Sequence, residues 1–318
     1  MKYSKESDIE LDKKVFPILS INKLAWLIEI PTQKLKVLAN KAESYYSPFE
    51  KKTVTKTRII DNPTGFLKDV QRRINKRICS HIAFPAYIIG GVKGQNPLNH
   101  PIQHIGKPVV ITIDVKDCFP SITNKWVFEI WFKQLGCSAP VAHLLTKLTT
   151  RIGHVPLGAP TSNCLANLAL LPCVKRAVEI AHQYNFAVPT QYIDDQAFSG
   201  YSLPDNFITL IIKEYYRQGI KINRKKIEVM WSNATQRVIG KTVNKKLSIP
   251  VSERHKVRAA LHELTKMEYT NPAYLKCYRN VHGRIHNLKN FHPRLSKIML
   301  QKLESLKNHS GGMGIKKI

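Results

Sequence analysis

The sequence predicts an α+β protein, in which a mixed core of strands and helices is followed by a separate bundle of basic helices. Three observations support this fold class. A chain of 318 residues is long enough for about two domains. Strand and helix patterns alternate through its middle, whereas the last ~65 residues contain helical patterns alone. Apolar residues make up 43% of the chain and charged residues 23%, which excludes a disordered or fibrous protein.

The first third of the chain predicts helices around one strand pair. Residues 1–50 have apolar residues at near-helical spacing. Residues 45–61 follow as two short strands joined by a basic turn at Lys51–Lys52. Residues 65–81 form an amphipathic helix, because an apolar residue recurs at every fourth position between basic ones.

The middle of the chain predicts a buried strand and several helices. Residues 109–115 (VVITIDV) are apolar and β-branched, so this strand carries Asp114 near its end. Helices are expected at 124–135 and 138–150. A loop rich in glycine and proline (GHVPLGAPTSN) then leads into a helix over 164–184.

The remaining chain begins with a strand pair and ends in helices. Residues 187–192 and 196–200 predict two strands with Asp194–Asp195 at the turn between them. The elements expected after this pair are a helix over 204–218, strands near 236–243 and 247–251, and helices over 252–266, 271–288 and 292–308.

Charge is distributed unevenly along the chain. Fifty Lys and Arg residues against 22 Asp and Glu give a net charge of +28. Residues 51–100 carry 10 bases and 2 acids, and residues 201–318 carry 24 bases and 7 acids, whereas residues 101–200 carry 8 and 6. A nearly neutral centre between two basic flanks favours a polyanionic partner such as nucleic acid.

Cysteine usage and hydropathy exclude several other classes. The six cysteines, at positions 79, 118, 137, 164, 173 and 277, have no metal-binding or disulfide spacing, which fits a reducing cytoplasm. No apolar stretch reaches the ~18 residues that a bilayer requires. The first residues mix acids and bases and do not form a signal peptide. We therefore expect a cytoplasmic protein without a membrane partner.

Three aspartates carry the strongest chemical signal. Asp194 and Asp195 are adjacent at a strand turn, where their charges repel each other unless a cation lies between them. Oxygen ligands of this kind suit Mg²⁺. Asp114 lies on a separate buried strand, with Asp117 three residues later. Carboxylates from two strands would hold two Mg²⁺ ions roughly 3.5–4 Å apart, which activate an attacking hydroxyl and stabilise a leaving pyrophosphate.

Three segments resemble the palm motifs of reverse transcriptases in order and spacing: ITIDVKDCFPSI (111–122), VPLGAPTSNCLANL (155–168) and QYIDDQAFSG (191–200). In size, compact fingers and a short thumb, the chain is most similar to the bacterial retron reverse transcriptases. The resemblance implies a right-hand polymerase fold with fingers, a palm built on an antiparallel sheet, and a helical thumb. The implied boundaries are 1–50 for an N-terminal helical region, 51–107 for the fingers, 108–245 for the palm with part of the fingers at 124–160, and 246–318 for the basic thumb.

The resemblance also implies roles at the reacting centre. Asp114, Asp194 and Asp195 match the family's metal-binding triad. Lys226 matches a lysine that protonates the departing pyrophosphate as a general acid. Lys225 is an equally reachable competitor for that role.

Further residues match positions that contact the incoming nucleotide. Arg58 would grip the triphosphate, with Lys56 a weaker candidate. Asp117 would lie near the triphosphate, and Phe119 would abut the sugar 2′-position and favour dNTPs. A loop of small residues would support the nucleotide, because it lets the backbone approach closely: Gly158, Ala159 and Pro160.

Two retron signatures occur in altered form, and one palm position departs from the family. Asn-Ala-x-x-His is represented by His100-Pro101-Ile102-Gln103-His104, which keeps His104. Val-Thr-Gly is represented by Val238-Ile239-Gly240. By resemblance, His104, Val238 and Gly240 would contact nucleic acid. Leu157 stands where many reverse transcriptases have a glutamine facing the nucleotide.

The terminal helices combine bases that neutralise phosphate with aromatic rings that stack on unpaired bases. In retron enzymes this region would recognise a structured stem-loop of the cognate RNA. The bases we single out for this contact are Arg254, Arg258, Arg279 and Arg284.

The resemblance implies an RNA-directed DNA polymerase that uses dNTPs and two Mg²⁺ ions. It would copy part of a cognate structured non-coding RNA into RNA-linked single-stranded DNA (msDNA), together with an effector protein in anti-phage defence. Two alternatives stay open. One is another compact prokaryotic reverse transcriptase, of the group II intron, diversity-generating or abortive-infection kind. The other is a non-catalytic RNA-binding scaffold, although three retained carboxylates without a metal would destabilise such a fold.

Overall fold

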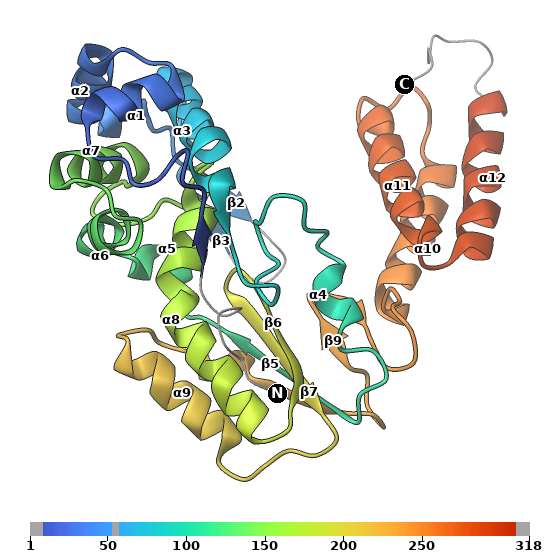
Figure 1. Cartoon of the computed structure of the whole chain (residues 1–318). Helices are drawn as coiled ribbons and strands as arrows, with labels where there is room; N and C mark the ends of the chain where they lie inside the picture. Colours follow the sequence, from blue (N-terminus) through green and yellow to red (C-terminus); the bar gives the residue numbers. More distant parts are fainter. Residues whose placement is uncertain (1–8, 53–56, 310–318) are drawn as a thin grey trace. The chain divides into compact units, whose positions relative to one another are not determined.

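A computed structural model describes residues 9–52 and 57–309 of the chain (Figure 1). The chain divides into two compact units, of which the first ends at Met230 and the second begins at Trp231. The first unit mixes helices and sheet, and the second is mainly helical, as the α+β prediction requires. None of the helices within the described residues is long and apolar enough to cross a membrane. All six cysteines are free thiols.

A four-stranded sheet organises the first unit, with strand order β6-β7-β5-β8. Strand β7 pairs antiparallel with both β6 and β5. The strands are β5 (Val109–Asp114), β6 (Ala187–Tyr192), β7 (Asp195–Gly200) and β8 (Glu228–Trp231). The sequence predicted the first three of these strands. It missed β8, a short strand that directly follows a lysine-rich segment.

The two faces of this sheet differ in character. Side chains alternate along a strand, and residues opposite each other in a ladder share a face. Asp114 lies opposite Asp195, and Ile111 lies opposite Phe198. The face of Ile111 and Phe198 is covered by helix α9, where the ring of Phe207 lies 5.3 Å from that of Phe198. Helices α8 (Ser162–Gln183) and α9 (Phe207–Arg217) run alongside the sheet in Figure 1.

Helices from distant parts of the chain gather at one end of the first unit (Figure 1). Their apolar residues share one continuous core with the sheet and α8. These helices are α1 (Ile21–Ile28), α2 (Thr32–Asn40), α3 (Gly65–Arg77), α6 (Asn124–Glu129) and α7 (Ala139–Thr149). Helix α3 ends before the expected residue 81, because a 3₁₀ turn follows at Cys79–His81. The expected helix at 124–135 becomes α6 followed by a π-helical turn at Ile130–Gln134.

A two-stranded hairpin, β2 (Phe49–Lys52) with β3 (Thr57–Ile60), stands beside these helices. Lys51 lies opposite Arg58 in this ladder, so Lys51 and Lys52 belong to a strand and not to the expected turn. The remaining short elements of this unit are β1 (Glu10–Leu11), a 3₁₀ turn (Ala42–Tyr45), β4 (Ile82–Ala83), α4 (Asn99–Ile102), α5 (Cys118–Ser121) and a 3₁₀ turn (Arg224–Lys226).

The second unit has its own hydrophobic core, formed by three helices. These are α10 (Val251–Lys266), α11 (Tyr274–Lys289) and α12 (Pro293–His309), which agree closely with the three terminal helices predicted. The strands expected near 236–243 and 247–251 reduce to one short hairpin, β9 (Arg237–Val238) with β10 (Lys241–Thr242). This hairpin belongs to the second unit, although it lies before the predicted palm–thumb boundary at 245/246.

Candidate active site

The three aspartates meet at one end of the sheet. Asp114 is the last residue of β5 and lies directly opposite Asp195, the first residue of β7. Asp194 lies in the tight turn between β6 and β7, where Ile193 adopts a left-handed conformation with φ 57°. The backbone amide of Val115 donates to the Asp194 carbonyl over 3.0 Å and ties this turn to β5. Two segments about 80 residues apart thus bring their carboxylates together.

Burial and mutual repulsion make the ionised state of these acids costly. Burial, together with the charges of Asp194 and Asp114, raises the pKa of Asp195 to about 6. Burial likewise raises the pKa of Asp194, with the charge of Asp114 adding to the effect. The charges of Lys226 and Arg58 oppose these shifts at both residues but do not cancel them. The site therefore has an excess of negative charge.

Lys226 is the cation in direct contact with this site. Its Nζ donates to Asp114 Oδ1 over 2.7 Å, and the Asp114 side chain is only 14% exposed. The segment before it is tied to the same strand, since the amide of Asn223 donates to the Asp114 carbonyl over 2.8 Å. Lys225 lies instead in a pocket with Lys116 and Tyr216. Of the two lysines, Lys226 is the one that the structure places at the carboxylates.

The donor set suits a hard divalent cation, because it consists of carboxylates, and burial and the charge of Asp114 raise the pKa values of Asp194 and Asp195. Within residues 9–52 and 57–309, however, no three His, Cys, Asp or Glu side chains are arranged so as to hold a metal ion. Asp114 is occupied by Lys226 in this arrangement. The ion pair and a cation shared by all three acids are therefore alternatives at Asp114.

The residues expected to contact a nucleotide lie on three different segments. Arg58 is on β3, and its charge acts on Asp194 and Asp195. Asp117 is exposed and adopts a left-handed conformation with φ 46° just before α5. Phe119, in α5, is half-buried against the main core. Lys56 falls outside the described residues.

The loop at 157–160 lies against the end of β3. Gly158 has φ 116°, and a Cβ on it would lie 2.8 Å from Ile60 Cγ2, so another residue here would strain the backbone and require the Ile60 side chain to shift. Ala159 is buried and Pro160 is half-buried. The backbone of Leu157 is hydrogen-bonded to Asp61 rather than to its own loop.

His104 lies inside the protein, which corrects the expectation that its ring contacts nucleic acid. The ring is fully buried and both nitrogens are occupied. Nδ1 lies 2.8 Å from Ser199 Oγ on β7, and Nε2 lies 2.7 Å from Thr190 Oγ1 on β6. His100 Nδ1 lies 2.6 Å from the same Thr190 hydroxyl. The hydrogen-bonding network of His100 and His104, which we call the histidine clasp, thus connects β6 to β7, the two strands joined by the turn at Asp194.

Burial lowers the pKa of both His100 and His104 to about 3, so both rings are neutral near pH 7. Sequence reasoning named His100 only as part of an altered signature and gave it no role, and it missed Thr190 and Ser199 because neither belongs to a charged cluster. The alternation of β6 and β7, which places Thr190 and Ser199 on the face of Asp195, was the available signal.

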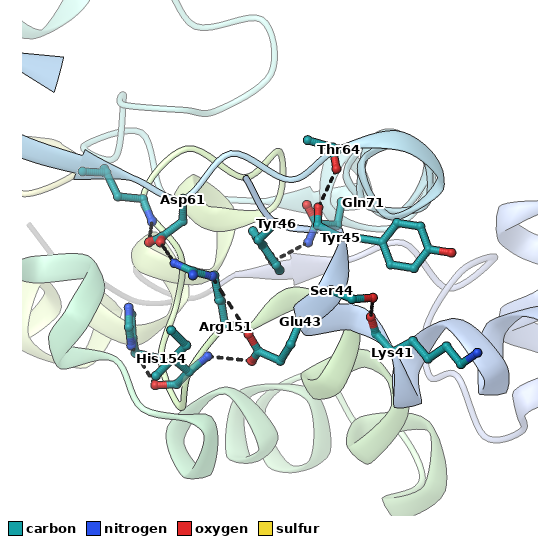
Figure 2. Close-up of polar contacts among 12 residues, drawn as sticks. Lys41, Glu43, Ser44, Tyr45, Tyr46, Asp61, Thr64, Gln71, Arg151 and His154 are labelled. Carbon is teal, nitrogen blue, oxygen red and sulfur yellow. Dashed lines mark hydrogen bonds and ion pairs between the residues drawn. The ribbon is translucent and has the colours of Figure 1, made fainter. Parts of the chain in front are cut away.

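A second polar cluster, also missed by sequence reasoning, lies beside the 157–160 loop (Figure 2). Asp61 accepts a hydrogen bond from Arg151 Nη1, and Arg151 also lies over the ring of Tyr46 at 5.5 Å. Glu43 Oε1 accepts from the amide of Ile152 over 2.7 Å. In the sequence Asp61 reads as an ordinary acid at the end of a strand, so nothing marked it as buried.

The second unit exposes the expected bases. Arg258, Arg279 and Arg284 are exposed and Arg254 is half-buried. Val238 is fully buried, which corrects the expectation that its side chain contacts nucleic acid, and Gly240 has φ 73° in the β9–β10 turn. Rings stack along α11 in the order Tyr274, Tyr278, His282 and His286, with neighbouring centroids 4.4–6.3 Å apart.

Comparisons with known proteins agree with this arrangement. Residues 49–258 match the family model described as reverse transcriptase (RNA-dependent DNA polymerase). The Retron Mx65 reverse transcriptase of Myxococcus xanthus is 32% identical over 231 residues, which are 66% of this chain and 54% of that protein. The Retron Ec86 reverse transcriptase of Escherichia coli is 30% identical over 244 residues, which are 74% of this chain and 75% of that protein. The chain thus spans about half the length of the first relative and three quarters of the second.

Among solved structures, the RNA-dependent RNA polymerase of a human picorbirnavirus aligns with a TM-score of 0.50 over 85% of this chain and 57% of that chain. The sequences are 14% identical, so this likeness concerns the fold alone. It places the α+β architecture among the polymerase folds.

Proposed function

This chain belongs to the reverse transcriptase family, among the retron reverse transcriptases, and from that premise we propose that it is an RNA-directed DNA polymerase that copies part of a cognate non-coding RNA into RNA-linked single-stranded DNA. The observation that carries the proposal is the meeting of Asp114, Asp194 and Asp195 at one end of the sheet, with Asp114 directly opposite Asp195. A scaffold that only bound RNA would gain nothing from acids held in so unfavourable a state.

In this proposal Asp114, Asp194 and Asp195 hold two Mg²⁺ ions. When bound, these ions supply an activated 3′- or 2′-hydroxyl nucleophile and neutralise the departing pyrophosphate. The chain itself supplies the proton for the leaving group. Without metal, Lys226 is paired with Asp114 over 2.7 Å, and metal ions bound at Asp114 would release its ammonium group beside the carboxylates. From there it protonates pyrophosphate as a general acid.

The nucleotide would bind between the β2–β3 hairpin and the sheet. Arg58 grips the triphosphate, and Asp117 lies near it. Phe119 meets the sugar at the 2′-position, where a bulky ring excludes a ribose hydroxyl. Gly158, Ala159 and Pro160 support the nucleotide through a backbone that Gly158 brings close to β3.

The template and its structured flanks would bind the basic surfaces. We assign residues 51–107 to the fingers, 108–245 to the palm with part of the fingers at 124–160, and 246–318 to the thumb. Arg254, Arg258, Arg279 and Arg284 neutralise RNA phosphates. The rings of Tyr278, His282 and His286 would stack on unpaired bases. We further propose that an effector protein joins the RNA–DNA product in anti-phage defence in the cytoplasm.

The test is reconstitution. Purified protein with its cognate RNA, dNTPs and Mg²⁺ should yield short DNA covalently linked to RNA, and D194N should yield none. Equal incorporation of NTPs would instead indicate an RNA polymerase and remove the role of Phe119. Sequencing the RNA that co-purifies with the protein separates the family alternatives, because a short structured transcript indicates a retron and a large ribozyme indicates an intron.

A further inference from the structure

The end of strand β3 is joined to the 157–160 loop by a two-way backbone contact. The amide of Asp61 donates to the Leu157 carbonyl over 2.8 Å. In return the amide of Leu157 donates to Asp61 Oδ2 over 3.2 Å. Asp61 and Leu157 are 96 residues apart in sequence, so this contact is a tertiary one between the hairpin and the loop.

The other oxygen of Asp61 is held by Arg151. Arg151 Nη1 donates to Asp61 Oδ1, and the two side chains are only 16% and 9% exposed. A buried ion pair of this kind contributes little when intact but costs much when one partner is removed, because the other charge is left without compensation. Arg151 therefore fixes the rotation of the Asp61 carboxylate and leaves Oδ2 facing the Leu157 amide.

Arg151 is itself held from its other sides. It lies over the ring of Tyr46 at 5.5 Å, and its Nε is 4.0 Å from Glu43 Oε2. The Tyr46 hydroxyl accepts from Gln71 Nε2 of α3 over 2.9 Å. Figure 2 shows these residues converging on Arg151 from separate segments. The guanidinium is thus a fixed anchor rather than a mobile surface charge.

This cluster lies between two groups that the proposed function assigns to the nucleotide. Arg58 is on β3, three residues before Asp61, which directly follows the last residue of that strand, and the 157–160 loop begins at the residue that Asp61 binds. Gly158 is so close to Ile60 that a Cβ there would clash. Any displacement of the Asp61 contact would therefore change the separation between Arg58 and the loop.

We propose that Asp61 is a positioning residue for the incoming dNTP, and that Arg151 is its orienting partner. Neither touches the nucleotide. Together they hold Arg58 and the 157–160 loop at the separation that a triphosphate requires, so they set nucleotide affinity and leave the chemical step unchanged. This inference rests on the proposed function. Because the contact does not involve the nucleobase of the dNTP, its effect is the same for all four dNTPs.

The experiment measures dNTP binding and turnover separately. For D61N, which keeps the size of the side chain and removes its charge, we expect the KM for each dNTP on a DNA-primed RNA template to rise about tenfold, with kcat within about threefold of the wild type. Equilibrium binding of dATP to the full chain should weaken by a similar factor. R151K keeps the charge but lacks the planar guanidinium group that orients the carboxylate, so it should show the same selective rise in KM. This variant tests the inference even if D61N fails to fold.

D69N is the matched control. Asp69 also pairs with an arginine, Arg72, over 3.1 Å, but both side chains are 62% exposed, so its removal should leave KM, kcat and binding unchanged. A lower Tm for D61N and R151K with unchanged dNTP binding and KM would overturn the inference, because the ion pair would then be structural only. If the wild type binds dATP and D61N binds it less well, the inference holds even where no incorporation is seen, and only the proposed function fails.

Discussion

The two faces of the central sheet are formed by the same strands but have opposite effects on stability. On one face Ile111 and Phe198 pack towards α9, which forms part of the main core. On the other face Asp114 and Asp195 meet in a state that burial and repulsion make unfavourable. Because side chains alternate along a strand, the buried Ile113 on the packed face is adjacent to Asp114 on the other face. Packing on the apolar face thus offsets the free-energy cost of bringing the acids together at the end of the other face.

The second face is itself divided. Its acidic end has more negative than positive charge, even with Lys226 paired to Asp114, whereas its far end is closed by neutral histidines that bond Thr190 and Ser199. The hairpin of Asp194–Asp195 is therefore tied down at a distance from the acids, by groups that bring no charge towards them. The histidines thus hold the hairpin in place without forming hydrogen bonds or ion pairs to the carboxylates of Asp194 and Asp195.

The largest expected effect is on the acidic end. D194N should reduce dNTP incorporation by about 10³-fold or more, because it removes a charged ligand for the metal ions that stabilise the transition state. Thermal stability in the absence of metal should not fall, since one of three repelling charges is lost. Incorporation rates and Tm are measured on the same preparation. Full activity of D194N would show that the carboxylates do not perform the reaction.

The apolar face should give the reverse result. F198A removes a fully buried ring that packs on Phe207, and we expect it to lower the free energy of unfolding by about 3–5 kcal/mol. The KM for dNTP, measured below the melting temperature, should stay close to that of the wild type. Chemical denaturation gives the first quantity and steady-state kinetics the second. A large change in KM with little loss of stability would show that the two faces are not separable.

This comparison also explains what the sequence could and could not predict. The strand at 109–115 and the pair around Asp194–Asp195 were predictable, because a β-branched apolar run and adjacent acids at a turn are strong local signals. The family resemblance then placed Lys226 near the acids. The clasp of His104 and the pair of Asp61 with Arg151 were not predictable, because each depends on contacts between residues about 90 positions apart. In sequence a buried histidine or aspartate looks like an exposed one.

A smaller effect is expected from the histidine clasp, through pH. His100 and His104 have folded-state pKa values of about 3, below the ordinary value near 6.5. The unfolded chain therefore binds more protons between these values, and stability that is complete above pH 6.5 is lost as the pH falls. By pH 5 each ring should cost about 2 kcal/mol. In H104Q the glutamine amide can bond both hydroxyls without titrating. Between pH 6.5 and 5 this variant should therefore lose about half as much stability through histidine protonation as the wild type does.

The difference between the wild type and H104Q is the informative quantity, because Asp195 acts in the opposite direction. Its raised pKa means that the folded state gains protons below about pH 6, and this increases stability as the pH falls further towards 4. Denaturation at pH 7, 6 and 5 for both proteins removes this shared contribution. Parallel curves for the two proteins would show that His104 does not remain neutral in the folded state.

The smallest effect tests a polar contact on the face that packs against α9. The hydroxyl of Tyr215, on α9, donates to Gln196 Oε1 over 2.9 Å, and both residues are buried. Gln196 lies opposite Ile113, so this bond crosses from helix to sheet on the side away from the acids. Y215F leaves the ring packing intact and removes one hydrogen bond, which should cost about 1 kcal/mol of unfolding free energy with no change in KM or kcat. Gln196 is adjacent to Asp195, so a change in kcat would mean that the apolar face also positions the acids and that the division between the faces is incomplete.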